Sequence, residues 1–123
     1  MVNWTEDELN KIGSATEVQL CSLRSDGTYR NPVTIWIVRM GSNLYIRAVS
    51  GVNGKWYKHT IEENEGRITA SGKEKDVYFE EYKGDQIPID EVYKSKYESF
   101  GYSIIETTLT TQAKAATLKV SPK

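Results

Sequence analysis

The sequence predicts an α+β domain in which a mostly antiparallel sheet of about six strands curls into a barrel-like shape, with short helices on its flanks. Segments of strand composition are joined by short turns that contain glycine, which favours antiparallel hairpins. Three other segments have apolar residues at helical spacing. About six strands in a chain of 123 residues tend to curl into a barrel-like sheet. The length matches one domain, so we expect residues 1–123 to form a single domain.

The first predicted element is a short helix that begins at a capping box, Thr5-Glu6-Asp7-Glu8, and ends at Gly13. Residues 18–23 then alternate in polarity and predict a strand, in which Cys21 is expected to be a small core residue. Ser25-Asp26-Gly27-Thr28 is typical of a turn, because Asp favours turns and Gly accepts a positive φ.

The central strands follow this turn. Residues 31–40 have strand composition, with apolar residues on both faces, and predict one strand. Gly41-Ser42-Asn43 turns the chain, and residues 44–48 return as the next strand, which makes this the clearest hairpin in the sequence. Residues 50–54 are expected to form a loop that leads into the next helix.

The second half is predicted to continue with helices and strands in alternation. A helix over residues 55–64 is expected to end at Gly66. A third helix is expected to begin near Pro88, since proline is tolerated in a first helical turn. The other expected elements are two strands, a short helix and a last strand: residues 67–71, 76–81, 113–116 and 118–120.

Composition excludes several function classes. The 16 basic and 17 acidic side chains give a net charge of −1, which lacks the cationic excess of non-specific nucleic-acid binding. Cys21 is the only cysteine, so neither an intramolecular disulfide nor a four-cysteine zinc site can form, and no metal site is predicted. No apolar run approaches the roughly 20 residues that span a bilayer. With no signal-peptide pattern, the expected location is the cytoplasm, without a membrane or nucleic-acid partner.

The most function-like feature begins at two arginines. Arg24 and Arg30 flank the turn at Gly27, so a hairpin would bring their guanidinium groups close together. These groups repel each other unless an anion lies near them, which favours a phosphate or carboxylate ligand. Surface arginines at hairpin ends also pair with carboxylates, and Asp26 is close by. An ordinary surface pair therefore remains an alternative interpretation.

A second cationic segment follows. Arg47 ends a predicted strand, and the loop that contains Ser50 and Gly51 can direct backbone amides outward, as anion-binding nests do. If Lys55 opens a helix, the positive end of that helix points toward the same ligand. Trp56 then adds a flat aromatic surface. A phosphate-sized cationic pocket beside aromatic rings suits FMN or a deazaflavin, with catalytic residues unassigned.

Several segments resemble a small bacterial domain family of unknown function that is grouped with the FMN-binding split barrels. The resemblance is carried by residues 23–36, 44–51 and 54–57 and extends over almost the whole chain from Thr5. It implies a split β-barrel. It also implies a homodimer, because split barrels of this type commonly build the site across the interface between subunits.

More distantly, the chain resembles the deazaflavin-dependent nitroreductases, in which the matching residues hold the cofactor phosphate and line the isoalloxazine-like ring. The match consists of an Arg-x-x-Gly-x-x-Arg turn and an Ala-Ser-Gly loop before Trp-Tyr: Arg24, Gly27, Arg30, Ala48, Ser50, Gly51, Trp56 and Tyr57, with Val49 inserted. The chain departs from those relatives at Lys55, where they usually have Pro, and at Asp26, where they often have Ser.

Two functions follow as hypotheses. The first is a split-barrel protein that binds a flavin or deazaflavin through basic residues at a barrel rim, with oxidoreductase activity as one use of such a cofactor and left open by the sequence. Its predicted cofactor-binding residues are Arg24, Gly27, Arg30, Arg47, Ser50, Gly51, Lys55 and Trp56. The alternative is a non-catalytic module that kept the barrel, lost the cofactor and binds a protein or a small anion.

Overall fold

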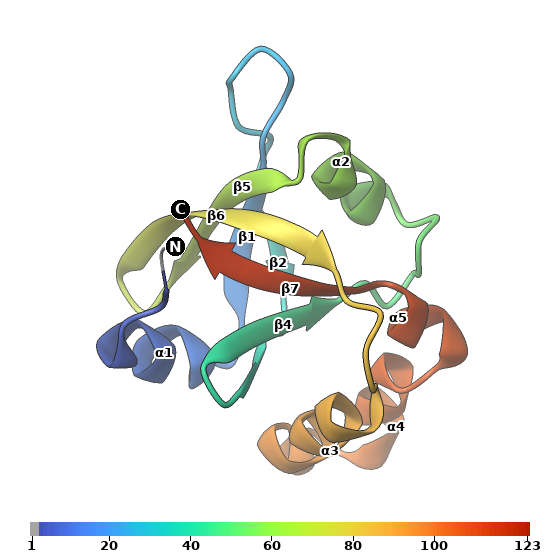
Figure 1. Cartoon of the computed structure of the whole chain (residues 1–123). Coiled ribbons are helices and arrows are strands. Elements are labelled where there is room, and N and C mark those ends of the chain that lie inside the picture. Colours follow the sequence, from blue (N-terminus) through green and yellow to red (C-terminus); the bar gives the residue numbers. More distant parts are fainter. Residues whose placement is uncertain (1–2) are drawn as a thin grey trace.

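Seven strands form one antiparallel sheet in residues 3–123, the part of the chain that this computed structural model describes (Figure 1). Along the sheet they follow the order β2-β1-β5-β6-β7-β4-β3. Their bounds are β1 Val18–Ser22, β2 Val33–Ile35, β3 Val38–Met40, β4 Asn43–Arg47, β5 Glu65–Ala70, β6 Lys73–Glu81 and β7 Thr117–Pro122. The predicted mostly antiparallel sheet is therefore confirmed.

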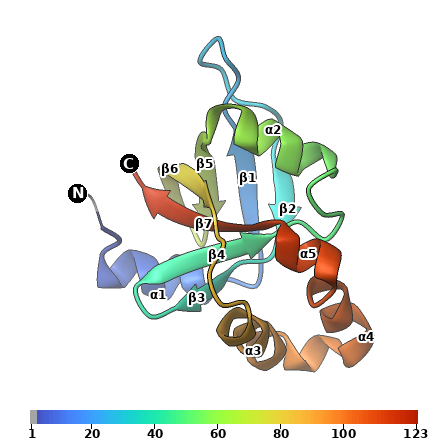
Figure 2. The ribbon, with the colours of Figure 1, turned by 45° about the vertical axis from the view of Figure 1, so that its right-hand side comes forward.

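The connection between the two edge strands shows why this sheet curls. β2 and β3 lie at opposite ends of the strand order, yet only Trp36 and Ile37 separate them in the chain. Two intervening residues allow at most about 11 Å between the ends of the two strands, so the two edges must approach each other at this point. Figure 2 shows the result, with β1 and β2 upright behind β4 and β7, which cross in front. The expected split barrel is confirmed.

The prediction of one strand over residues 31–40 is wrong, because the chain leaves the sheet at Ile37. β2 pairs with β1, whereas β3 pairs with β4. Between them, the Ile37 amide donates a hydrogen bond to the Tyr97 hydroxyl (3.3 Å), and its carbonyl accepts one from the Lys96 ammonium. Side chains from a distant helix thus replace the strand partners that both backbone groups would otherwise need.

Two helices cover the sheet in the first half of the chain. α1 (Glu6–Gly13) has the predicted capping box, since the Glu8 amide donates to Thr5 Oγ1 (3.1 Å) and the Thr5 amide donates to the Glu8 carboxylate (2.9 Å). α2 (Lys55–Glu63) ends where Asn64 adopts a left-handed φ of 58°. The prediction that Gly66 ends this helix is wrong. Gly66 lies in β5, where a Cβ atom would stand 2.5 Å from the Cys21 carbonyl oxygen.

The C-terminal part contains a row of short helices and then the last strand. α3 (Ile87–Lys96) carries Pro88 in its first turn as predicted. It is followed by α4 (Tyr102–Ile105), α5 (Thr111–Ala115) and two single 3-10 turns, Glu98–Phe100 and Glu106–Thr108. β7 then inserts between β6 and β4 (Figure 1). No helix in residues 3–123 has the length and apolarity that a bilayer crossing needs.

The apolar side chains form two clusters. The larger one fills the inside of the curled sheet under α1 and α2. The smaller one lies between β3, β4 and α3 and contains Tyr93 and Tyr97. The expectation that Cys21 belongs to the core is wrong, since the alternation in β1 buries Val18, Leu20 and Ser22 and leaves Cys21 only half-buried.

Candidate functional site

A groove of about 600 Å³ lies between the β1–β2 loop and the N-terminus of α2. We call it the cationic groove. It brings together five of the eight residues that the sequence predicts for the site: Arg24, Arg30, Ser50, Lys55 and Trp56. Two segments that are more than 20 positions apart in the chain therefore contribute positive side chains to one surface. Arg47, Gly27 and Gly51 do not line the groove.

Arg24 presents its charge on the loop side of the groove. Its guanidinium donates to the Tyr29 carbonyl (2.9 Å) and to Thr28 Oγ1 (3.2 Å), and it forms no ion pair with a described carboxylate. Asp26 instead accepts hydrogen bonds from the hydroxyl (2.6 Å) and the amide (3.0 Å) of Thr28, which lower the pKa of its carboxyl group. Arg24 and Asp26 therefore make no direct ion pair, although the Arg24 charge also helps to lower the Asp26 pKa.

Arg30 is already engaged by the protein. Its guanidinium lies 2.8 Å from the Glu62 carboxylate and donates to the carbonyls of Leu23 (3.1 Å) and His59 (3.4 Å). These contacts tie β1 to α2 across the groove. Because Glu62 compensates its charge, Arg30 contributes a rigid wall rather than an open positive charge.

The start of α2 supplies a second open positive end. Gly54 is the N-cap residue, no side chain caps the helix, and no acidic residue stands in its first turn. The amides of residues 55–57 therefore have no acceptor within the helix, and the positive end of the helix dipole lies beside the groove. Lys55 adds a full charge, because it forms no ion pair with any described residue.

The two glycines that sequence analysis assigned to the site shape its loops instead. Gly27 turns the β1–β2 loop at φ 89° with open space around it. Gly51 has φ 79°, and a Cβ there would stand 2.3 Å from Gln112 Cγ of α5. The Gly51 amide already donates to the Ala48 carbonyl (2.9 Å), so it is not available to a ligand. Both positions require glycine for backbone geometry.

Arg47 is placed apart from the other cations and is buried. Its guanidinium lies 2.7 Å from the Asp90 carboxylate and donates to the Thr108 carbonyl (2.9 Å) and the Gln86 amide oxygen (2.8 Å). Its side chain is 0% exposed. The Arg47–Asp90 contact is close but poorly aligned as a hydrogen bond, so it is best described as an ion pair. Arg47 therefore joins β4 to α3 instead of entering the cationic groove.

A smaller pocket of about 340 Å³ adjoins the groove and shares Ser50 and Trp56 with it. We call it the Tyr93 pocket. Trp36, Arg47 and Tyr93 line its inner part. Its walls come from β2, β4, α2, α3 and the segment after α4, which only the folded chain brings together.

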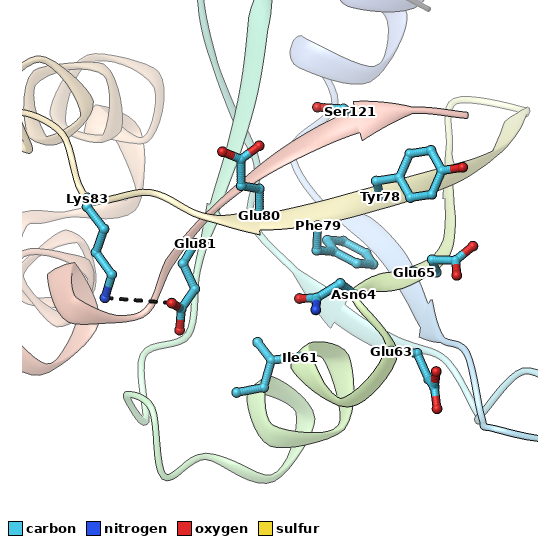
Figure 3. Close-up of a pocket in the computed structure, with 10 residues that line it drawn as sticks. All are labelled: Ile61, Glu63, Asn64, Glu65, Tyr78, Phe79, Glu80, Glu81, Lys83 and Ser121. Carbon is cyan, nitrogen blue, oxygen red and sulfur yellow. Dashed lines mark ion pairs between the residues drawn. The ribbon is translucent and has the colours of Figure 1, made fainter.

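A third hollow, of about 760 Å³, is larger than both but does not contain the cationic side chains of the groove (Figure 3). It is a shallow hollow between the end of α2 and β6, and four carboxylates line it: Glu63, Glu65, Glu80 and Glu81. Two lysines counter them: Lys83 lies 3.8 Å from Glu81, and Lys123 forms an ion pair with Glu65. Negative charge at this density repels phosphate, so size alone does not select this hollow as the anion site. Among the described residues, no group of three metal-binding side chains occurs.

Sequence reasoning missed several residues of the two cavities. Asn31, Pro32, Val33 and His59 line the cationic groove, and the first three directly follow Arg30, which was the one available signal. No local pattern indicated a pocket at Tyr93, whose ring packs in the smaller apolar cluster. No local pattern indicated that Asp90 would hold Arg47.

Comparison with protein families gives one match. A family model described as "Uncharacterized protein conserved in bacteria (DUF2255)" matches residues 8–120. No curated protein matches the chain in sequence.

Solved structures similar to this chain include three with different names. A candidate pyridoxamine 5'-phosphate oxidase from Listeria innocua has a TM-score of 0.65 and 10% identity, covering 96% of this chain and 92% of its own. The heme storage protein HutZ from Vibrio cholerae has a TM-score of 0.63 and 12% identity, and the match covers 96% of this chain and 89% of HutZ. An F420 reductase has a TM-score of 0.57 and 15% identity, and the match covers 98% of this chain and 96% of the reductase. At these identities the comparison establishes the split-barrel fold and nothing finer.

Proposed function

We propose that this chain, which belongs to the bacterial family DUF2255, binds a flavin-class cofactor, FMN or a deazaflavin, in the cationic groove. One observation carries the proposal. Arg24, Lys55 and the uncapped start of α2 present unpaired positive charge to the same groove, next to the half-buried ring of Trp56. A phosphorylated planar molecule matches both features, because the phosphate needs the charge and the ring system needs a flat apolar surface.

The roles of the residues follow from their contacts. Arg24 and Lys55 would hold the phosphate from the two sides of the groove, and the Ser50 hydroxyl would donate to it. Trp56 would pack along the ring system, with Pro32 and Val33 on the opposite strand side. Arg30, paired with Glu62, would keep the two walls at a set distance. A bound flavin would supply redox chemistry, while the chain binds and orients it.

The similar folds support a cofactor site without selecting the cofactor. One of the three similar structures is named for F420, which is a deazaflavin, and another for heme. Heme is a second candidate, because His59, the only histidine in the chain, lines the cationic groove. Imidazole is a common axial ligand of heme iron.

We expect FMN to raise the thermal stability of the purified protein. At a concentration 100 times its Kd, a ligand that binds only the folded state adds about 2.7 kcal/mol, which raises the Tm by about 10 °C for a domain of this size. Riboflavin, which lacks the phosphate, should stabilise much less at equal concentration.

Measuring the Tm in the same way with F420 and with hemin shows which of the candidate cofactors the protein binds. Hemin binding through His59 would also shift the absorption maximum of hemin, and His59→Ala should abolish that shift. If none of these molecules changes the Tm, the cofactor proposal is wrong, and a non-catalytic module that binds a protein or a small anion is the function that remains.

We also propose that two copies of the chain associate through an apolar row on α4 and the 3-10 turn before it. Phe100, Tyr102 and Ile104 are 42%, 66% and 47% exposed, and exposed apolar clusters of this kind mark contact sites.

Light scattering should give the mass of a dimer at micromolar concentration, and Tyr102→Glu with Ile104→Glu should give a monomer. Ile87→Glu, at an isoleucine outside the row that is 67% exposed, is the control and should stay dimeric. A monomeric wild-type protein would contradict this proposal.

A further inference from the structure

We propose that the cationic groove discriminates among anions by their charge and selects a phosphate monoester over anions that carry a single negative charge. A phosphate monoester carries up to two negative charges near neutral pH, whereas a phosphate diester carries one. The inference rests on the proposed function, because it concerns the phosphate end of the same groove. It separates the two candidate flavins, since the phosphate of FMN is a monoester and that of F420 is a diester.

The groove has two uncompensated positive charges and no carboxylate in its lining. Its charged lining residues are Arg24, Arg30 and Lys55, and Glu62 neutralises Arg30 at 2.8 Å from outside the groove. Arg24 and Lys55 form no ion pair with any described residue. A dianion balances both charges, whereas a monoanion leaves one of them uncompensated.

Asp26, two positions after Arg24, does not cancel the charge of that arginine. Its carboxylate accepts hydrogen bonds from the hydroxyl and the amide of Thr28, and it is exposed on the loop. Water weakens and salt screens the interaction between exposed charges that are not in contact. A phosphate that shares a hydrogen bond with Arg24 therefore interacts with it more strongly than Asp26 does.

The two uncompensated cations stand on different walls of the groove. Arg24 belongs to the β1–β2 loop and Lys55 is the first residue of α2, and Figure 2 shows both segments in the upper part of the molecule. Both side chains are exposed, so each can move toward an anion. Arg24 uses Nη1 for its bonds to Thr28 and Tyr29, which leaves the N–H groups of Nε and Nη2 for a ligand. Each cation can therefore meet a different oxygen of one phosphate.

The neutral donors of the groove do not distinguish a monoester from a singly charged anion. The exposed Ser50 hydroxyl can donate to an oxygen of any phosphate or sulfate group. The free amides at the start of α2 can do the same, because Gly54 has no side chain that could accept from them. Discrimination by charge therefore depends on Arg24 and Lys55.

A series of flavins that share one ring system and differ in charge tests the inference. Riboflavin has no charge on its tail, riboflavin 5′-sulfate and the methyl ester of FMN have one, and FMN has two at about pH 8. Quenching of flavin fluorescence on titration gives each Kd. Wild-type protein should bind FMN about tenfold more tightly than either singly charged flavin. The sulfate separates charge from size, because it has three terminal oxygens, as FMN has, and no added methyl group.

A matched pair of lysine variants tests the source of the preference. Lys55→Gln should reduce it to less than about threefold, because one uncompensated cation remains, and should leave riboflavin affinity unchanged. Lys58→Gln changes an exposed lysine of the same helix that does not line the groove, and it should keep the tenfold preference. All titrations use one pH, so that protonation of His59, which also lines the groove, does not differ among them.

The outcomes separate this inference from the proposed function. If FMN, the sulfate and the methyl ester bind equally well and riboflavin binds more weakly, the groove holds an anion without counting its charges, and only this inference is wrong. A sulfate that binds as tightly as FMN beside a weaker methyl ester would show exclusion by size, which also overturns it. So does a full preference in Lys55→Gln. If no flavin binds, the proposed function fails, and this inference fails with it.

Discussion

Replacing Asp90 with alanine is expected to lower the free energy of unfolding by about 3–5 kcal/mol, because the change leaves the Arg47 guanidinium buried and unpaired. Asp90 Oδ1 lies 2.7 Å from Arg47, whose side chain is 0% exposed, and Lys114 contacts the other carboxylate oxygen at 3.3 Å. Urea unfolding followed by circular dichroism measures the change.

Glu91→Ala is the matched control for this prediction. Glu91 is the next residue of α3, and it pairs with Lys94 at 3.3 Å on the surface, with both side chains about half exposed. Loss of such a pair should change stability by less than about 1 kcal/mol. If Asp90→Ala is no more destabilising than Glu91→Ala, Arg47 is not held as a structural cation, and its predicted role in anion binding would return.

Removing the two unpaired cations of the cationic groove should weaken FMN binding by about 100-fold or more. Each hydrogen bond to a charged group contributes about 1.5–3 kcal/mol, and Arg24→Ala with Lys55→Ala removes two. Riboflavin affinity should change little, because it has no phosphate. Quenching of flavin fluorescence on titration measures both affinities.

The design of this variant depends on the environment of each cation. Arg30 is kept, because its loss would leave Glu62 unpaired and untie α2 from β1, which confuses folding with binding. Arg24 bonds only within its own loop, and Lys55 is exposed, so the fold should survive. Lys58→Ala with Lys94→Ala removes the same charge outside the groove and should bind FMN as wild type does. Equal loss in both variants would show a general charge effect and refute the phosphate assignment.

Local features of the fold could be predicted from the sequence because their partners are neighbours in the chain. The capping box of α1 involves Thr5 and Glu8, three positions apart. The β3–β4 hairpin follows from strand residues on both sides of a glycine turn. Arg24, Lys55 and Trp56 were also found in this way, since each lies beside a turn or a helix start.

Features that depend on distant partners could not be predicted. Residues 31–40 have the composition of one strand. Lys96 at the end of α3 and Tyr97 directly after it, 59 and 60 positions along the chain, nevertheless hold the Ile37 backbone out of the sheet. Arg47 at a strand end resembled an exposed cation, and no local signal showed that Asp90 would bury and neutralise it.

The amino-acid sequence by itself determined most of the helices, strands and turns, residues 31–40 excepted, and which segments carry the basic side chains. Those outcomes depend on backbone preferences and polarity patterns a few residues long. Only the tertiary structure decided which of these cations stay unpaired. Charge compensation and hydrogen bonding act through space, and closure of the barrel brings together residues that are far apart in the chain.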